Sequence, residues 1–586
     1  MKNQELANIF YEIADYLTME DEVFRPLAFK KAAVSLETMK ENIEEIYKKG
    51  GIPALKEISG VGKNIAEKIE EYLKTGRIKC CEDLKKKTPI DIQELIAVEG
   101  LGPKKIKFLY QKLKIKNLKD LEKASKKHEI APLFGFGEKT EKNILQGIEF
   151  LKTSKGRFLL GEILPLVKEI AEKLKNLNQV KKISIAGSVR RMKETIGDVD
   201  FLVASNKPAQ IMDFFVSLPE VIKIWSKGKT KSSIRLKNGT DMDLRIVPEK
   251  SYGAALQYFT GSKEHNIALR KIAMTKGLKL NEYGLFRGSV KIAGENEKEI
   301  YKKLGLQWIP AEIRENQGEI EMAQKNNLPK LIEQNDIKGD LHCHSNWSDG
   351  ENTIEEIAKQ AVSQGYEYIG ISDHTKFLKI ANGLDEKKLA QQKKEIDKIN
   401  VKCFTPLDAK LSNGARMSNV KCRILQGCEA NILKDGSIDI KNETLKKLDF
   451  VIAGVHSSFK MPKEQMTERI IKAMQNPFVD IISHLTGRLL KHREEYEIDF
   501  DKILACAKET GTILEINANP YRLDLNAQNI RKTKEMGIKM IISSDSHHKE
   551  QLNFIEFGVS QARRGWAEKK DIVNTFSLKK LLDFLK

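Results

Sequence analysis

Two aspartates separated by one residue, Asp198 and Asp200, lie in the apolar run 196–203. Because side chains alternate along a strand, both carboxylates are expected on one face. A third carboxylate, Asp243, lies in a second apolar run, 242–247. Three carboxylates on neighbouring strands can hold two divalent ions, which activate an attacking hydroxyl and stabilise a leaving phosphate oxygen. The pattern predicts nucleotidyl transfer with Mg²⁺ or Mn²⁺.

The segment before the aspartates carries groups that suit a triphosphate. Gly187 and Ser188 follow an apolar run and supply amide and hydroxyl donors, and Arg191 supplies a guanidinium. Residues 187–200 resemble the nucleotidyltransferase signature of family X DNA polymerases. The resemblance adds Gly197 and Arg157 as residues at the nucleotide.

Residues 254–262, followed by Asn266, resemble the thumb motif of the same family. By this likeness Tyr258 and Asn266 line the minor-groove side of the incoming base pair. Phe259 packs beside the sugar of the nucleotide, and Gly261 belongs to the same motif.

A second set of chemically active residues lies in the last 250 residues. The chain has ten histidines, and six follow apolar, strand-like runs. With three carboxylates they form an N/O set that suits Zn²⁺, Mn²⁺ or Fe ions rather than Ca²⁺. Such a cluster can generate hydroxide for attack on a phosphoester. The nine residues are His342, His344, Asp349, His374, Glu429, His456, His484, Asp545 and His547.

These blocks are similar to the polymerase and histidinol phosphatase (PHP) domain, and every ligand position of its nine-residue pattern has a match. The other four histidines, His128, His265, His492 and His548, match no ligand position and are expected at the surface. One departure from the pattern is the segment 401–422, which reads as a surface loop. Its Cys403 and Cys422 lack metal-ligand spacing and are expected to be free thiols.

A short element recurs three times in the first 150 residues: apolar-x-Gly-x-Gly followed by a helical pattern, at 58–62, 98–102 and 133–137. Glycines allow a tight turn and leave the first amides of the following helix open to a phosphate. The pattern predicts helix-hairpin-helix elements that grip DNA backbone without reading sequence; for the third copy, simple helix capping is an equal alternative. By resemblance to the family, the DNA-binding residues are Gly60, Gly62, Gly100, Gly102, Arg25 and Lys68.

The charge distribution predicts that residues 1–335 bind a polyanion such as nucleic acid. Residues 1–335 carry 61 basic and 46 acidic side chains, a net +15, whereas residues 336–586 carry 40 and 36, a net +4. There is no leader pattern and no apolar run long enough to span a membrane. Seven cysteines without a CxxC motif indicate free thiols. We expect a cytoplasmic, nucleoid-associated monomer.

The expected fold is multidomain, α+β and α/β. Helix-hairpin-helix domains precede a nucleotidyltransferase palm with a thumb, and strand–helix repetition with polar groups at strand ends favours a distorted C-terminal β/α barrel. The palm should contain a helix at 160–176 and strands at 182–186, 198–204 and 241–247. The expected domains are 1–82 (lyase-like), 83–150 (fingers), 151–250 (palm), 251–318 (thumb), 319–335 (linker) and 336–586 (PHP).

Together these features predict a gap-filling repair polymerase that acts on gapped or primer–template DNA with dNTPs. The PHP domain implies 3′→5′ exonuclease activity, with abasic-site endonuclease or 3′-phosphatase work also possible. Two alternatives remain: a nucleotidyltransferase that modifies RNA or small molecules, and a non-catalytic DNA-repair scaffold. Lys68 matches a lyase lysine of relatives, although phosphate binding is the simpler reading.

Overall fold

The computed structural model describes residues 2–38, 42–58, 60–98, 101–153, 156–402 and 422–585. Gly100, Cys403 and most of the expected 401–422 loop lie outside these residues. The chain forms two compact units. The first contains residues 1–155 with 489–494, and the second contains residues 156–488 with 495–586.

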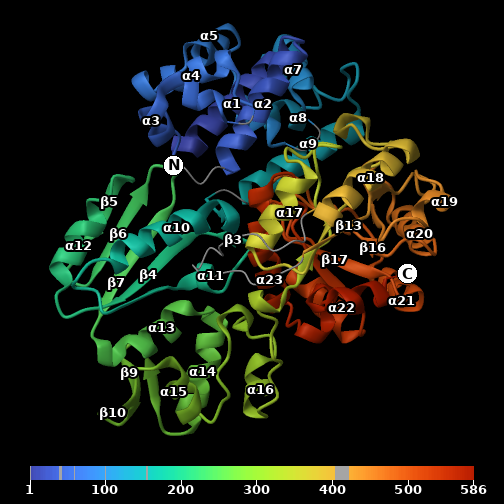
Figure 1. The fold of residues 1–586 in the computed structure, drawn as a ribbon. Coiled ribbons are helices and arrows are strands. Elements are labelled where there is room, and N and C mark those ends of the chain that lie inside the picture. Colours follow the sequence, from blue (N-terminus) through green and yellow to red (C-terminus); the bar gives the residue numbers. More distant parts are fainter. Residues whose placement is uncertain are drawn as a thin grey trace. The chain divides into compact units, whose positions relative to one another are not determined.

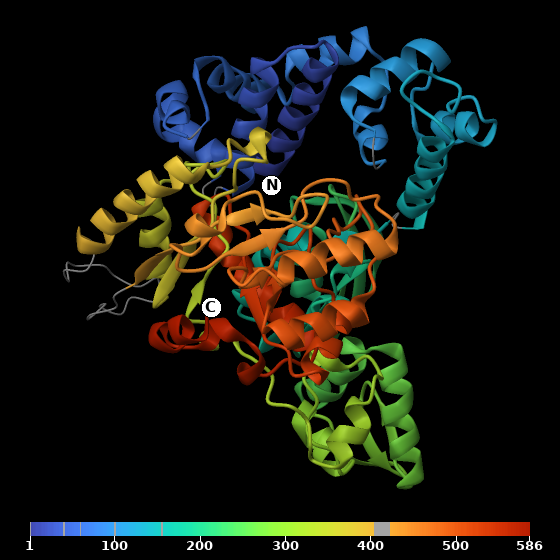
Figure 2. The same ribbon diagram turned by 90° about the vertical axis from the view of Figure 1, so that its right-hand side faces the viewer.

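The first unit is helical and has two hydrophobic cores (Figures 1 and 2). One core contains Phe10, Leu36 and Ile69, and the other contains Ile106 and Ile148. Apolar side chains at helical spacing build each core, as in the buried Ile65, Ala66 and Ile69 after the first hairpin. The helices are α1 (Lys2–Met19), α2 (Phe24–Thr38), α3 (Ile43–Lys56), α4 (Lys63–Thr75), α5 (Lys79–Lys87), α6 (Ile92–Ile96), α7 (Pro103–Leu113), α8 (Leu118–Lys126) and α9 (Glu138–Thr153).

A five-stranded sheet in the order β2-β4-β7-β6-β5 lies in the segment expected to be the palm, and we keep that name for it. The central strands β4 and β7 are parallel, and the other neighbours are antiparallel. The expected palm helix and three strands are confirmed. The hairpin β5–β6 was not predicted, because its lysine-rich sequence hides the alternation of a strand. The elements are β1 (Phe158–Leu159), α10 (Leu160–Lys175), β2 (Lys182–Ile185), α11 (Gly187–Arg190), β3 (Thr195–Ile196), β4 (Asp198–Ala204), α12 (Pro208–Val216), β5 (Val221–Lys227), β6 (Lys231–Leu236) and β7 (Asp241–Val247).

The thumb follows the palm and contains a small antiparallel sheet in the order β10-β9-β8. Its core includes Ile300, Ile320 and Ala323. The last two residues lie on helix α16, inside the stretch 319–335 that we expected to be a linker. That expectation was wrong for α16, because its apolar face is buried against the thumb. The elements are α13 (Tyr252–Thr260), α14 (Lys263–Thr275), β8 (Lys279–Asn281), β9 (Gly284–Arg287), β10 (Val290–Ala293), α15 (Glu297–Lys303) and α16 (Glu319–Gln324).

The C-terminal domain contains two parallel sheets, β11-β12-β13 and β14-β15-β16-β17-β18. Single parallel bridges join them at both seams, between Cys343 and Ser546 and between His374 and Glu429. Within the described residues the strands therefore approach a barrel without a continuous closed ladder. The strands are β11 (Gly339–Asp340), β12 (Tyr368–Ile371), β13 (Arg423–Gln426), β14 (Glu429–Asn431), β15 (Ile452–Gly454), β16 (Ile481–Ile482), β17 (Ile513–Asn517) and β18 (Met540–Ser543).

Helices cover these strands on the outside (Figure 2). They are α17 (Ile354–Ser363), α18 (Glu386–Lys402), α19 (Asn442–Leu445), α20 (Lys463–Met474), α21 (Phe500–Thr510), α22 (Ala527–Glu535), α23 (Ile555–Arg564) and α24 (Leu578–Phe584). All six cysteines of the described residues are free. Among those residues, no helix is both long and apolar enough to cross a membrane.

Candidate active sites

The three predicted palm carboxylates lie together on β4 and β7. Asp200 and Asp243 are direct register partners across the two parallel strands, and Asp198 lies two residues before Asp200 on the same face. Burial and the charges of Asp198 and Asp243 raise the pKa of Asp200 to about 7. The Asp243 carboxylate is 2.7 Å from Lys231 Nζ. A cluster of like charges of this kind fits a divalent cation, because oxygen ligands suit Mg²⁺ and Mn²⁺.

Gly187 permits the close approach of helix α11 to these carboxylates. Its φ is +61°, and a Cβ at this position would overlap Asp200 Oδ2. Both facts exclude a side chain, because positive φ strains other residues and the carboxylate leaves no space. Ser188 follows it at the edge of a cavity of about 440 Å³.

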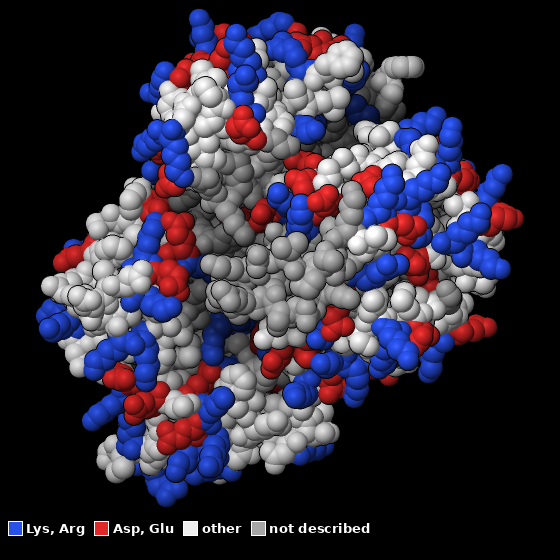
Figure 3. Space-filling view, viewed as in Figure 1, with Lys and Arg blue, Asp and Glu red and all other residues white. Residues whose placement is uncertain are grey.

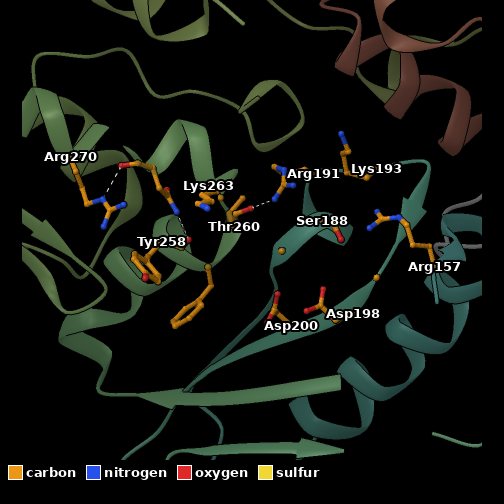
Figure 4. Close-up of a pocket in the computed structure, with 15 residues that line it drawn as sticks. Arg157, Ser188, Arg191, Lys193, Asp198, Asp200, Tyr258, Thr260, Lys263 and Arg270 are labelled. Carbon is orange, nitrogen blue, oxygen red and sulfur yellow. Dashed lines mark hydrogen bonds between the residues drawn. The ribbon is translucent and has the colours of Figure 1, made fainter. Parts of the chain in front are cut away.

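This cavity lies between the palm and the thumb (Figure 4). Asp198, Asp200 and Ser188 line its palm side, and Tyr258 lies on the thumb side. Asp243 does not line it. Three lysines and arginines of the lining, Lys193, Lys263 and Arg270, were missed by sequence reasoning, because charged residues in helices and loops usually face solvent. The predicted residues that line the cavity are Arg157, Gly187, Ser188, Arg191, Gly197, Asp198, Asp200, Tyr258, Phe259, Gly261 and Asn266.

Two predicted arginines are held by neighbouring groups. Arg191 Nε donates to Glu315 Oε1 at 3.1 Å. Arg157 Nε donates to Thr195 Oγ1 at 2.9 Å. Both guanidinium groups thus lie fixed at the cavity wall, where they can meet an anion.

The thumb end of the cavity presents aromatic and amide groups. The rings of Tyr258 and Phe259 meet edge to face at 5.1 Å, and Arg245 lies over the Phe259 ring at 4.7 Å. Asn266 Nδ2 donates to the Tyr258 carbonyl oxygen, and Gln257 Nε2 donates to Asn266 Oδ1, both at 2.7 Å. These contacts fix the orientation of the Asn266 amide.

All nine predicted ligands of the C-terminal domain come together at the strand ends. Eight of them form three overlapping groups, each with ligand atoms within 4.8 Å of one another. The ninth, His484, lies 2.9 Å from Glu429 through Nε2. The groups are His344, Asp349, His374 and His547; His342, His344 and Asp545; and His374, Glu429 and His456.

Several ligand atoms of this cluster are buried, and no hydrogen-bond partner is found for them within the described residues. They include His342 Nε2, both ring nitrogens of His344 and Glu429 Oε2. Unpaired buried polar atoms are costly, so their convergence fits bound metal ions. Imidazole and carboxylate ligands together favour Zn²⁺, Mn²⁺ or Fe ions.

Residues behind the ligands were not predicted. Glu515 Oε1 lies 2.6 Å from His342 Nδ1, and Glu515 Oε2 accepts the backbone N–H of His484 at 2.7 Å. Arg522 Nε lies 3.4 Å from Asp545 Oδ2. The two-residue spacing of Glu515 and Asn517 on β17 could have revealed the buried carboxylate, whereas nothing local distinguishes Arg522.

The four other histidines differ in environment. The side chain of His128 is 80% exposed, His492 is exposed, and His548 is partly buried. His265 is fully buried, so our expectation of a surface position was wrong for this residue. It forms two hydrogen bonds inside the thumb, which compensate for its loss of hydration.

The first and third glycine turns share a left-handed glycine. Gly60 and Gly135 have φ of +74° and +79°, and Gly62 and Gly102 are the N-cap residues of helices α4 and α7. The third copy therefore has the same left-handed turn as the first, followed by α9. Lys68 Nζ pairs with Glu71 at 3.1 Å, and Arg25 pairs with Glu22 at 2.9 Å. Many Lys and Arg side chains lie on this unit (Figure 3).

Known domain families match four segments of the chain. Residues 1–78 match a helix-hairpin-helix domain, and residues 92–149 match a SAM-like helix-hairpin-helix tandem. Residues 255–315 match the DNA polymerase beta thumb, and residues 340–519 match the PHP domain. The tandem match spans both the second and the third glycine turn.

Similar proteins cover the whole chain or its C-terminal domain. The DNA polymerase/3′-5′ exonuclease PolX of Bacillus subtilis is 38% identical over 100% of both chains. A probable phosphatase of Acetivibrio thermocellus is 30% identical over 36% of this chain and 78% of its own length. These matches confirm the predicted family and fold class. The chain belongs to the family X DNA polymerases that carry a C-terminal PHP domain.

Proposed function

We propose that the palm and thumb add nucleotides to the 3′ end of a primer in gapped DNA. The observation that carries this proposal is that Asp200, which lines the cavity with Gly187 and Arg191, is the register partner of Asp243 on the neighbouring strand. Asp198, Asp200 and Asp243 would hold the metal ions. When bound, these ions supply activation of the primer hydroxyl and charge neutralisation at the phosphates.

The other cavity residues would contact different parts of the nucleotide: the triphosphate, the base and the sugar. Ser188, Arg191 and Arg157 face the triphosphate, where hydroxyl and guanidinium donors suit its oxygens. Tyr258 and Asn266 face the base, and Phe259 the sugar, with Gly261 in the turn that joins them to α14. Primer attack on the α-phosphate then forms the new phosphodiester and releases pyrophosphate.

We propose that the helix-hairpin-helix turns hold the DNA on either side of the gap. Gly60 and Gly62 begin the first site and Gly102 the second, since backbone amides at such turns suit phosphate oxygens. Arg25 and Lys68 add positive charge. Lys68 is a phosphate ligand in this proposal, and lyase chemistry remains a separate prediction.

We propose that the PHP domain removes nucleotides from DNA 3′ ends by metal-dependent hydrolysis. The three overlapping ligand groups support several metal ions, with Mn²⁺, Zn²⁺ or Fe as candidates. Glu515 holds His342 in the tautomer with a proton on Nδ1, which leaves Nε2 for a metal. The substrate is the same DNA that the polymerase extends, and the protein acts as a monomer on the nucleoid.

Primer extension on a one-nucleotide gap tests the polymerase proposal. Wild-type protein with Mg²⁺ or Mn²⁺ should add one templated nucleotide, and labelled 3′ ends should be shortened when dNTPs are omitted. Absence of extension with either metal would contradict the polymerase proposal. Addition to RNA without a template would favour the alternative nucleotidyltransferase.

A further inference from the structure

His265 lies on helix α14, directly before the cavity residue Asn266, and is fully buried. Its Nδ1 is 2.7 Å from Glu319 Oε1, and its Nε2 is 2.9 Å from the Tyr301 hydroxyl oxygen. Glu319 is also fully buried and belongs to α16. Helix α14 is therefore tied to α15 and α16 through one imidazole.

The partners of this imidazole define its protonation. Glu319 also accepts the backbone N–H groups of Asn316 at 2.8 Å and Gln317 at 2.7 Å. Burial alone would raise the pKa of Glu319, but donation by His265 and by the Gln317 backbone amide lowers it. Burial, together with the charge of Arg314, lowers the pKa of His265. A neutral His265 thus donates from Nδ1 to ionised Glu319 and accepts from Tyr301 at Nε2.

The Tyr301 ring continues this network toward the nucleotide cavity. The Arg314 guanidinium lies 5.1 Å from the Tyr301 ring centre, and Arg314 donates to Glu297 at 2.7 Å. Glu297 also accepts from Arg190 at 2.9 Å, and Arg190 donates to Thr260 Oγ1 at 2.6 Å. Thr260 lines the cavity. The network therefore begins at Glu319 on α16 and ends at Thr260, which lines the cavity.

We propose that His265 is a positioning residue for nucleotide binding: its contact with Glu319 fixes helix α14, which presents Lys263 and Asn266 to the incoming nucleotide. This inference rests on the proposed polymerase function. The physical reason is the rigidity of the helix, because a shift of the buried His265 moves its neighbours in the cavity. Residues 263 and 266 both line that cavity.

Protonation of His265 should weaken this arrangement. The titratable and charged groups that face it are Glu319, Tyr301, Arg314 and Glu297. A second proton on the ring removes the acceptor for the Tyr301 hydroxyl and adds a positive charge close to Arg314. The KM for dNTP should therefore rise as the pH falls through the lowered pKa of His265.

Substitutions at His265 separate a positioning role from a merely structural one. His265→Leu removes the side-chain donor to the buried Glu319 and the acceptor of the Tyr301 hydroxyl, so the KM and the equilibrium Kd for dNTP should rise about tenfold. kcat should change much less. The amide of His265→Gln can both donate to Glu319 and accept from Tyr301, so this variant should restore dNTP binding. Because glutamine does not titrate, the rise of the KM at low pH should disappear. His128→Leu is the matched control, because His128 forms a similar 2.8 Å contact with Glu141 but is exposed.

The measurements use the full chain, gapped DNA with a nuclease-resistant phosphorothioate primer, and circular dichroism to verify folding. An unchanged KM and Kd in folded His265→Leu overturns the inference while wild-type extension leaves the proposed function intact. Absence of extension by the wild type contradicts the proposed function instead. Should His265→Leu fail to fold, Tyr301→Phe carries the same test, since it removes only the hydroxyl and should raise the KM in the same direction.

Discussion

Glu194 of the palm accepts a hydrogen bond of 2.7 Å from Arg488 Nη2, which belongs to the PHP domain. Arg488 is almost fully buried, and its charge also reaches Asp524. Glu194 lies three residues after the cavity residue Arg191, and Arg488 lies four residues after the ligand His484. The segments that carry the two candidate sites thus meet at one ion pair.

This ion pair should contribute strongly to stability. Glu194→Ala leaves the Arg488 guanidinium buried without its main partner, so we expect a loss of about 3 kcal/mol in the free energy of unfolding. Urea unfolding followed by tryptophan fluorescence reports this change in the second unit, which contains all four tryptophans of the chain. Lys168→Ala is the control. It removes the exposed Lys168–Glu556 pair of the same interface and should cost less than about 1 kcal/mol. Equal losses of unfolding free energy in Glu194→Ala and Lys168→Ala would contradict a strong contribution of the Glu194–Arg488 ion pair.

Asp243→Ala should abolish nucleotide addition and leave binding to gapped DNA nearly unchanged. The reason is the loss of one of three carboxylates that hold the metal ions in the proposed reaction. Primer extension and DNA mobility shifts measure the two properties. Asp241→Asn serves as the control, because both Asp241 oxygens are engaged by Arg235 and Trp225. Normal extension by Asp243→Ala would refute the role of this residue.

The register of β4 and β7 explains why the carboxylates could be predicted. The two-residue period of a strand places Asp198 and Asp200 on one face whatever the rest of the fold does. The histidines were predictable for a similar reason, since each follows an apolar run that ends at the same side of a parallel sheet. Patterns of this kind are local in sequence.

The residues that escaped prediction depend on packing between distant segments. His265 and Glu319 are 54 positions apart, and the sequence around each of them gives no sign that the side chain is buried. Helix α16 resembled a linker in sequence because three of its six residues are polar, Glu319, Glu321 and Gln324, although Ile320 and Ala323 are buried. Lys193 and Arg270 lie at the cavity only because palm and thumb enclose it.

Gly187→Ala should reduce kcat/KM for nucleotide addition by about 100-fold, because the new Cβ displaces the Asp200 carboxylate. Nuclease activity should be retained. Gly277→Ala is a matched control: Gly277 has φ +66°, but its Cβ would meet no atom within 4 Å. That variant shares the backbone strain without the overlap. Similar losses in both variants would assign the effect to strain alone.

The stability of the thumb should depend on pH through His265. Its folded pKa is lowered below the ordinary value, so the unfolded chain binds a proton more readily. The contribution of neutral His265 is therefore present above about pH 6.5 and is lost as the pH falls below it. Denaturation of wild type and His265→Gln between pH 5 and 8 tests this. If the free energy of unfolding of the wild type falls with decreasing pH no more steeply than that of His265→Gln, His265 does not cause the pH dependence.

His344→Ala and Asp545→Ala should remove the nuclease activity and leave primer extension measurable, because their side chains belong to the C-terminal cluster. Point variants are preferable to a truncation near residue 320. Trp566 of the PHP domain and Leu331 belong to the thumb core, so truncation would expose that core. Retained manganese-dependent nuclease activity in either variant would refute the location of the reaction.

Lys68 should bind a phosphate group, and its Schiff-base chemistry can be tested directly. An amine attacks an abasic sugar only when it is neutral, whereas Lys68 Nζ forms an ion pair with Glu71 Oε2 at 3.1 Å. We therefore expect Lys68→Ala to weaken binding to a 5′-phosphorylated gap. Borohydride trapping on a 5′-deoxyribose phosphate substrate separates the two roles. A covalent adduct that Lys68→Ala abolishes would establish lyase chemistry, and absence of an adduct in the wild type would leave Lys68 as a phosphate ligand.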